Sequence, residues 1–305
     1  MRFWRRKPVL SIVVVVYRMP EQADKTLRSL SPAYQQGADP RHYEVVVVEN
    51  ASDQLLGRER ATRHAANVRY VQRQETQRTP VHACNQGVAR ARGSHVAIMI
   101  DGARMLSPGV VRQTLEVFRA TPRAAICTPG FHLGHKLQQA AVCDGYDEQT
   151  EAQLLEEIAW PADGYRLFDV AVFSGTSGGG FFLPMWESNY FAMPMRTWRR
   201  LGGMDTRYND FGGGNCNLDL FKRLLEQRRM PLVLLYGEGS FHQFHGGVTT
   251  NTLPDERARL YKLLAEQDLA IRGPLEPPPW RPLLYGTPHP AVQRFLAKSL
   301  ERVAA

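Results

Sequence analysis

Short apolar runs alternate with amphipathic stretches along the first part of the chain. The runs at 9–17 (VLSIVVVVY) and 43–50 (YEVVVVEN) are rich in β-branched residues, which is typical of strands buried on both faces of a parallel sheet. Further runs at 67–72 and 95–101 flank a helical pattern at 80–93, and helix formers also follow the first run. This alternation predicts an α/β fold with an open, mostly parallel sheet flanked by helices.

The middle of the chain has a weaker and more mixed pattern. Up to residue 184, it predicts a helix over 107–120 with Ser107 as N-cap, a strand over 124–130, an acidic helix over 147–160, and a glycine-rich loop at 174–184 that runs into an apolar strand. After that loop, it predicts a helix that ends at Gly202 and a second helix over 217–229. A strand over 231–237, followed by a histidine-bearing loop, completes this part of the chain. We expect the part between about 130 and 180 to be an insertion into this fold.

The chain after residue 252 has the composition of a peripheral appendage. A stiff, proline-rich segment at 276–282 precedes a stretch at 289–305 whose apolar residues fall roughly on one helical face. We therefore predict one domain over 1–251 and a helical extension over 252–305. The last helix is expected to pack on the domain or on a partner, with peripheral membrane contact as the alternative.

Composition limits the class of protein. With 305 residues, 43% of them hydrophobic, the chain can bury a full core. No apolar run reaches the ~18 residues of a membrane span, and the first 20 residues lack the features of a signal peptide, so a cytoplasmic location, with the inner membrane face as an alternative, is expected. The four cysteines are far apart and form no CxxC pair, which argues against a zinc ribbon or a disulfide framework.

The net charge of +8 narrows the choice of partner only slightly. An arginine-rich start (MRFWRRK) and this charge suit nucleic acid, an anionic membrane surface or negatively charged substrates. The chain has no zinc-finger spacing, RNP-type motif or continuous basic helix, which argues against nucleic acid as a partner.

Polar residues stand at the ends of several predicted strands. Tyr17, Glu49, Asn50 and Asp101 follow apolar runs, and the carboxyl ends of parallel strands form the edge at which open α/β sheets bind ligands. Asp101 precedes Gly102, a pair that is also common in simple turns. We expect these four side chains to face one crevice.

Several segments resemble, in order and spacing, the successive motifs of family 2 glycosyltransferases with the GT-A fold. They are LSIVVVVYRMPEQADKTLRSL, YEVVVVENASD, HACNQGVARARGSHVAIMIDGA, LGGMDTRYNDFGGG and NLDLFKRL, within residues 8–250. The resemblance implies a GT-A fold and transfer of a sugar from a nucleotide-sugar donor to an acceptor hydroxyl, usually with inversion and a divalent metal (Mn or Mg). It also implies a glycan or lipid-linked acceptor and a role in bacterial cell-surface polysaccharide biosynthesis.

The resemblance also implies a metal and nucleotide site. Asp101 matches the first acidic residue of the DxD motif, which contacts the ribose or the metal, whereas Ala103 stands where the second Asp is expected. His245, before two glycines, is similar to a late histidine ligand of this fold, and His242 is a second candidate ligand. The nucleotide-binding positions implied by the resemblance are Tyr17, Glu49, Asn50, Asp53, Asn85 and Asp101, although Asn85 is equally suited to helix packing.

The catalytic base is the main departure from the family pattern. In the family, a Glu-Asp pair usually precedes an Asp-Leu that opens a helix, and the Asp of the pair is usually the base. If the Asp-Leu is matched to Asp219 and Leu220, the pair falls on 216–217 (Cys-Asn). If the gap in the match is placed differently, the pair falls on 214–215 (Gly-Asn). Neither a thiol nor an amide replaces a carboxylate base. The chain therefore resembles a divergent subgroup, and the candidate bases are Glu187 and Asp219.

Two other functions remain as alternatives. A non-catalytic module that binds nucleotide-sugars or glycans on the same fold would explain the missing Glu-Asp pair and the shortened DxD motif. A sugar nucleotidyltransferase shares the sheet topology, but it needs a glycine-rich loop with Arg and Lys after the first strand, and VVYRMPEQAD is not such a loop.

Overall fold

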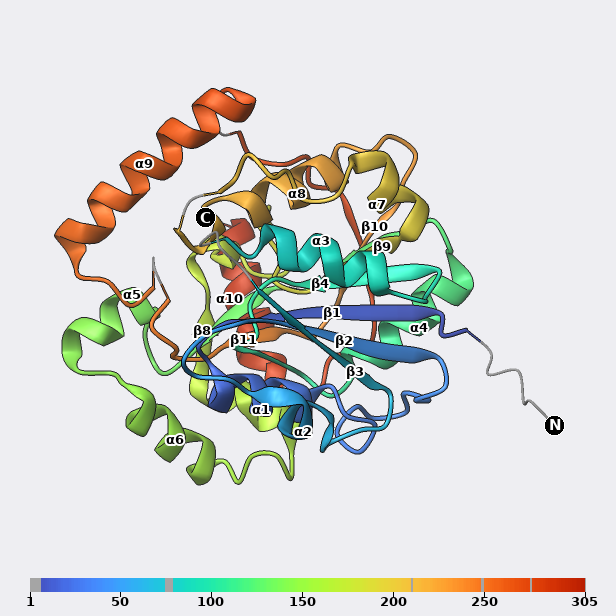
Figure 1. Ribbon diagram of the computed structural model, residues 1–305. Coiled ribbons are helices and arrows are strands. Elements are labelled where there is room, and N and C mark those ends of the chain that lie inside the picture. Colours follow the sequence, from blue (N-terminus) through green and yellow to red (C-terminus); the bar gives the residue numbers. More distant parts are fainter. Residues whose placement is uncertain (1–6, 75–78, 210, 248–249, 275, 305) are drawn as a thin grey trace.

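One large sheet organises the computed structural model, which describes residues 7–74, 79–209, 211–247, 250–274 and 276–304 (Figure 1). In spatial order its strands are β12 (Pro282–Tyr285), β10 (Leu232–Leu235), β6 (Ala125–Cys127), β9 (Phe191–Pro194), β4 (His95–Met99), β1 (Leu10–Val16), β2 (Tyr43–Asn50) and β3 (Val68–Arg73). All neighbours pair in parallel except β9, which is antiparallel to β4 and β6. The mostly parallel α/β architecture is confirmed, and the basic segment 1–6 lies outside the described residues.

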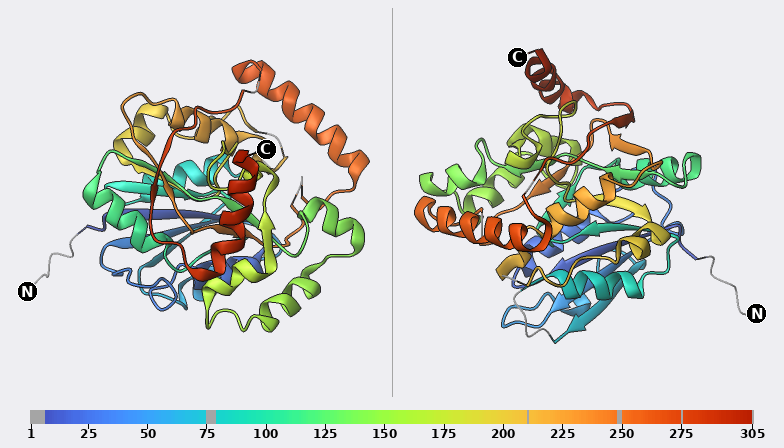
Figure 2. Two further views of the ribbon diagram at one scale, coloured as in Figure 1. Left: turned by 180° about the vertical axis from the view of Figure 1, so that it is seen from behind. Right: turned by 90° about the horizontal axis from the view of Figure 1, so that it is seen from above.

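Helices cover both faces of this sheet and explain its continuous apolar runs. Along β1, Val13 and Val15 belong to one apolar cluster while Ile12 and Val14 belong to the other, so alternate side chains point to opposite faces. The first cluster is covered by α3 (Val81–Arg90), α7 (Met195–Leu201) and α8 (Cys216–Leu225), and the second by α1 (Pro20–Ser29), α2 (Gly57–Thr62) and α4 (Val110–Ala120) (Figures 1 and 2). Gly87 lets α3 approach β1, because a Cβ there would lie 2.4 Å from Val13 Cγ1.

A second, smaller sheet lies beyond the carboxyl ends of the parallel strands. Its order is β5 (Arg104–Leu106), β11 (Ser240–His242), β7 (Gly130–Leu133) and β8 (Ala171–Phe173). The last helix, α10 (Gln293–Ala304), packs Phe295 against Phe131 and Phe173, with ring centroids 4.9 and 5.0 Å apart. The small sheet is therefore supported from behind by the end of the chain (Figure 2).

The remaining helices lie at the periphery. They are α5 (Gln138–Ala141), α6 (Glu148–Glu157), α9 (Pro254–Arg272) and the 3₁₀ turns η1 (Val142–Asp144), η2 (Gly164–Val170), η3 (Gly175–Ser177), η4 (Phe211–Gly213) and η5 (Pro290–Val292). Among the described residues, no helix combines the length and apolar composition that a membrane span requires. Residues after 252 supply α9, strand β12 of the large sheet, and α10. The division into a domain over 1–251 and an extension over 252–305 stays a prediction.

Three local predictions were wrong. The apolar strand expected near 181–184 is a series of turns, since Gly180 has φ +76° and Phe181 packs edge-on against Phe173. Helix α4 begins at Val110 with Gly109 as N-cap, because the Ser107 hydroxyl donates to Glu238 instead of capping the helix. The histidine-bearing loop is partly β11, and its strand ends at His242. The predicted end of α7 at Gly202, with φ +75°, is confirmed.

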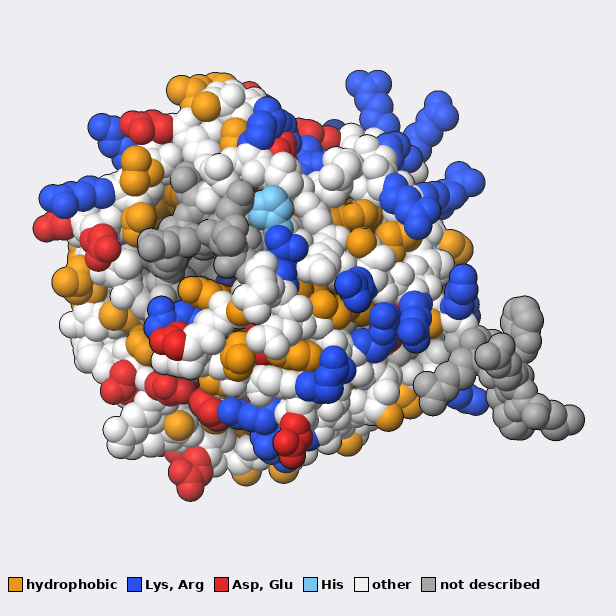
Figure 3. Space-filling model, viewed as in Figure 1, with side chains coloured by type: hydrophobic (Ala, Val, Ile, Leu, Met, Phe, Trp, Pro, Cys, Tyr) orange, Lys and Arg blue, Asp and Glu red, His pale blue; other side chains and the backbone are white. Residues whose placement is uncertain are grey.

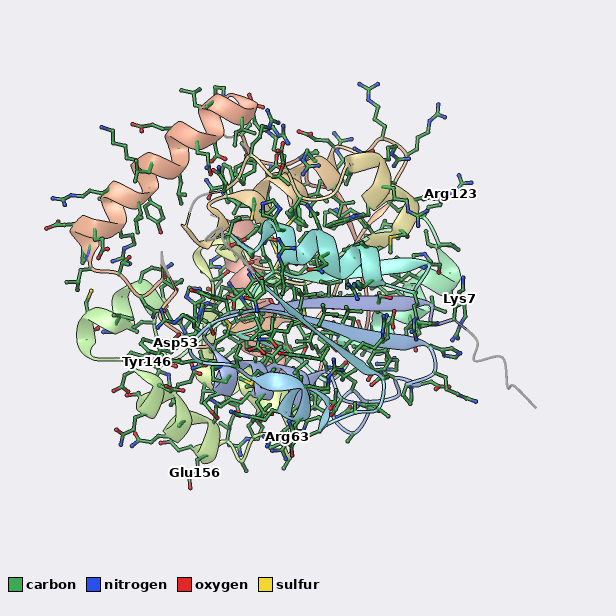
Figure 4. All side chains as sticks on the ribbon, in the orientation of Figure 1. Lys7, Asp53, Arg63, Arg123, Tyr146 and Glu156 are labelled. Atoms are coloured by element: carbon green, nitrogen blue, oxygen red, sulfur yellow. The ribbon has the colours of Figure 1, made fainter. Side chains whose placement is uncertain are left out.

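Basic side chains gather at the edge where the parallel strands begin. Figure 3 shows Lys and Arg side chains over this end, and Figure 4 places Lys7 and Arg123 there, away from Asp53 and Tyr146. A hollow at this edge is lined by Arg123, Arg196, Thr197, Arg200, Arg228, Arg229 and Met230. The arginine-rich hollow is thus separated from the strand-end crevice at which the sequence predicts a nucleotide site.

Candidate active site

Asp101, His242 and His245 come together beyond the end of β4. His242 Nε2 and His245 Nε2 lie 3.4 and 3.3 Å from Asp101 Oδ2, and 3.0 Å from each other. Asp101 Oδ1 accepts a hydrogen bond from the Ala103 amide at 2.8 Å, which fixes the carboxylate in the turn. The structure therefore unites one carboxylate and two imidazoles, from β11 and the loop after it, with ligand atoms within 4.8 Å of one another.

A hydrogen bond with Gln138 fixes the orientation of the His242 ring. Its Nδ1 lies 2.5 Å from Oε1 of Gln138, a buried residue at the start of α5. An amide oxygen only accepts, so Nδ1 carries the proton and Nε2 presents its lone pair to Asp101 and His245. Burial holds the pKa of His242 well below its usual range, and the nearby Arg104 cation lowers it further. The imidazole is therefore neutral, as a metal ligand must be.

The donor set fits a divalent cation. Burial alone would raise the pKa of Asp101, but the neighbouring His245, His242 and Arg104 side chains hold it well below its usual range. A carboxylate with two imidazoles is a known ligand set for divalent transition-metal ions, and the Gln138 contact is typical of residues that orient such ligands.

Glu187 lies between two elements that orient its carboxylate. Thr176 Oγ1 donates to Oε1 at 3.2 Å, and Asn217 Nδ2 donates to Oε2 at 2.8 Å. Asn217 occupies one of the two positions at which the resemblance to the family motifs predicts a carboxylate base. In this chain, the amide at that position holds the carboxylate of Glu187.

Asp219, the other candidate base, is engaged in ion pairs. Its Oδ2 accepts from Arg223 Nε at 2.8 Å and its Oδ1 from Arg272 Nε at 2.6 Å, while its side chain is 3% exposed. Both oxygens therefore face guanidinium groups. The geometry gives Asp219 the role of connecting α8 to α9.

The loops after β1 and β2 meet where the nucleoside pocket was predicted. Arg18 and Asp53 form an exposed ion pair across these loops, at 3.0 Å. Tyr17 is 44% exposed beside them, and Asn50 is buried with no hydrogen-bond partner for its Oδ1. An unpaired buried acceptor is costly, so Asn50 is suited to receive a donor group from a ligand.

Two predicted nucleotide-binding residues instead bond within the protein. Glu49 is fully buried and accepts hydrogen bonds from the amides of Leu56 and Gly57 and from the Tyr70 hydroxyl. The Asn85 side chain donates to the Met204 carbonyl and accepts from the Met204 amide. Glu49 thus fixes the start of α2, and Asn85 fixes the loop after α7.

Comparison with known proteins decides the family. The family model described as "Glycosyl transferase family 2" matches residues 11–173, more than half of the chain. This chain belongs to glycosyl transferase family 2. It is a glycosyltransferase whose donor is a nucleotide-sugar. No curated protein matches its sequence significantly.

Solved structures agree on the fold. The S. aureus protein TarS, residues 1–349, superposes with a TM-score of 0.53 at 13% identity, over 96% of this chain and 71% of that chain. The mannosyltransferase PcManGT from Pyrobaculum calidifontis, solved with GDP-Man and Mn²⁺, gives 0.53 at 16% identity, over 98% and 71%. TarS 1–349 with UDP-GlcNAc gives 0.52 at 12% identity, over 96% and 72%. At these identities the likeness establishes the GT-A fold of the glycosyltransferase.

Three residues of the glycosyltransferase site were missed in the sequence. Gln138 orients His242, Asn217 holds Glu187, and Arg104 lies 3.4 Å from Asp101. Only Arg104 left a signal, a charge three residues after Asp101 at the start of an otherwise apolar strand. The other two act across long chain separations that no local pattern records.

Glu151 gives the glycosyltransferase a pH-dependent support for its histidine loop. Its Oε2 accepts from the Phe244 amide at 2.7 Å, and burial raises its pKa from 4.5 to about 7. Between these values the unfolded chain binds fewer protons than the folded one, so the free energy of unfolding falls by about 3 kcal/mol as pH rises. Glu151→Gln is expected to abolish this fall in denaturation curves recorded from pH 4 to 8.

The exposed Glu157→Gln at the end of the same helix is the matched control, which should follow the wild-type pH dependence. A Glu151→Gln variant that still loses stability over the same range would contradict the assignment.

Proposed function

We propose that this glycosyltransferase transfers a sugar, with inversion, from a nucleotide-sugar to a hydroxyl of a glycan or lipid-linked acceptor, with Glu187 as the general base. The contact that carries the proposal is the 2.8 Å hydrogen bond from Asn217 to Glu187. It holds a carboxylate beside Asn217, one of the two residues that stand where the family pattern has its base. Asp219 is set aside because two arginines occupy its oxygens.

In this reaction, Glu187 accepts the proton and the nucleoside diphosphate is the leaving group. Glu187 takes the proton of the acceptor hydroxyl, whose oxygen forms a bond to the anomeric carbon of the donor sugar. The bond from that carbon to the diphosphate breaks on the opposite face, and the nucleoside diphosphate leaves with the electron pair. Attack and departure on opposite faces invert the anomeric configuration.

Asp101, His242 and His245 would hold a divalent cation at the donor diphosphate. When bound, such an ion supplies positive charge to the leaving group. The protein contributes ligands in fixed orientation, with Gln138 setting the proton position on His242. The Tyr17, Asn50 and Asp53 loops would form the nucleoside pocket beside them.

The acceptor and its setting are proposed on the family alone. A role in cell-surface polysaccharide synthesis, in the cytoplasm or at the inner membrane face, is compatible with the arginine-rich edge of the molecule. The edge lies opposite the candidate site, so it would orient the enzyme without entering the reaction.

Calorimetric titration tests the donor site. UDP, GDP and dTDP are titrated into the full chain with Mn²⁺, Mg²⁺ or EDTA, and nucleotide release is then followed with sugars of the nucleotide that binds. Metal-dependent binding followed by turnover is expected. Binding without turnover for any acceptor class would favour the non-catalytic module, and no binding at all would reject the donor site.

Replacement of Gln138 is expected to weaken metal binding. Gln138→Leu removes the acceptor that fixes His242 Nδ1–H, and loss of such an orienting contact lowers metal affinity by about 10- to 100-fold. Titration of Mn²⁺ alone measures the change. Gln149→Leu, at an exposed position on α6, is the control that should keep wild-type affinity, and equal affinity in both variants would remove Gln138 from the site.

A further inference from the structure

Arg104 is a buried cation at the donor end of the site. It opens β5, directly opposite His242 of β11, and its backbone amide donates to Thr26 Oγ1 at 3.0 Å. The residue is 8% exposed, and its Nε lies 3.4 Å from Asp101 Oδ2. A guanidinium is thus fixed on the same small sheet as the metal-binding imidazole.

The hydrogen-bonding capacity of this guanidinium is largely unused. Arg104 Nε and Nη1 are buried and have no hydrogen-bond partner. Its ion pair with Asp101, at 3.4 Å, is longer than a good charge-assisted hydrogen bond of about 2.7–2.9 Å. Buried donors without partners are rare, because each forfeits its hydration, so this pair calls for an additional acceptor.

The charges of two carboxylates, Asp101 at the metal-binding cluster and the proposed base Glu187, act on Arg104. Burial lowers the pKa of Arg104, whereas the charges of Asp101 and Glu187 oppose that shift. In the proposed reaction, the donor diphosphate would bind beside the metal ligands. Ala103, at the position of the missing second Asp, is itself fully buried and offers no charge.

We propose that Arg104 is a diphosphate-binding residue that donates hydrogen bonds to the leaving nucleoside diphosphate and neutralises part of its charge. This inference rests on the proposed donor site and names the protein group that recognises its diphosphate. A planar guanidinium can donate to two phosphate oxygens at once. Asp101 holds the side chain in place until the nucleotide enters.

The test is the preference for a nucleoside diphosphate over its monophosphate. The diphosphate that binds best among UDP, GDP and dTDP, and the matching monophosphate, are titrated in EDTA and in Mn²⁺. Wild type in EDTA should favour the diphosphate by about 10-fold or more, as expected for hydrogen bonds between charged groups. Arg104→Gln should abolish this preference in EDTA, Arg104→Lys should retain part of it, and monophosphate affinity should stay close to wild type.

Two controls separate this role from a structural one. Arg123→Gln removes an exposed arginine from the opposite edge and should leave the preference intact. Asp101→Asn alone is compared with Asp101→Asn combined with Arg104→Gln, since the double variant leaves no buried charge unpaired. Thermal melting identifies any variant that does not fold.

The outcomes are distinct. If the diphosphate preference survives in Arg104→Gln, or if wild type has none in EDTA, Arg104 serves only as the counter-ion of Asp101 and the inference is rejected. If wild type binds no nucleoside diphosphate under any condition, the proposed donor site itself fails.

Discussion

Glu187→Gln is expected to lower the turnover number by about 10²- to 10⁴-fold, the usual contribution of a general base. Glutamine keeps the size of the side chain; its amide oxygen can still accept from Asn217, and its amide nitrogen can donate to the Thr176 hydroxyl, so the site should stay folded. Nucleotide affinity should therefore hardly change. Steady-state release of nucleoside diphosphate, with a titration of the same nucleotide, separates the two quantities.

Asp219→Asn is the paired comparison for this prediction. It removes charge from a carboxylate held by Arg223 and Arg272, so it should lower the melting temperature but leave turnover per folded molecule close to wild type. The pH profile adds a second readout, because the ascending limb that reports the base should vanish in Glu187→Gln. Full turnover in Glu187→Gln would return the role to Asp219 or to no residue.

Phe295→Ala is expected to lower the free energy of unfolding by about 3–5 kcal/mol, the usual cost of deleting a buried aromatic ring. Phe295 is almost fully buried and contacts Phe131, Phe168 and Phe173. The cavity would lie against the small sheet that carries Arg104 and His242. Urea denaturation measures the change.

Leu300→Ala on the same helix is the control. Leu300 is 60% exposed, so its truncation should change stability by less than about 0.5 kcal/mol. Equal effects of the two substitutions would mean that α10 does not support the core in solution.

The large sheet and its ligand-binding edge could be predicted because they depend on local patterns. The runs that became β1 and β2 are long and β-branched, those that became β3 and β4 are shorter, and the spacing after β4 placed Asp101 at the edge. His242 and His245 were found by resemblance, since nothing local connects them to Asp101. Their approach to 3.4 and 3.3 Å depends on β11 pairing with β5, a long-range register.

The polar contacts of the site could not be predicted from the sequence, because they also join residues that are far apart in the chain. Glu49 has the type and place of a nucleotide-binding acid, yet the tight turn to α2 presents two backbone amides that use its oxygens. Glu187 follows the turns that replace the strand expected near 181–184, and it meets Asn217 across 30 residues of chain. Whether a polar residue faces a ligand or its own backbone depends on loop paths, which residue type does not determine.

The dependence of the small sheet on α10 has a consequence for synthesis on the ribosome. β1 to β4 lie within the first hundred residues, so much of the large sheet can begin to form early, with Asp101 already at its edge. His242 and His245 emerge much later, and Phe295 later still. A nascent chain therefore carries an incomplete centre for most of its elongation, and the capacity to transfer sugar should arise only in the final stage of translation.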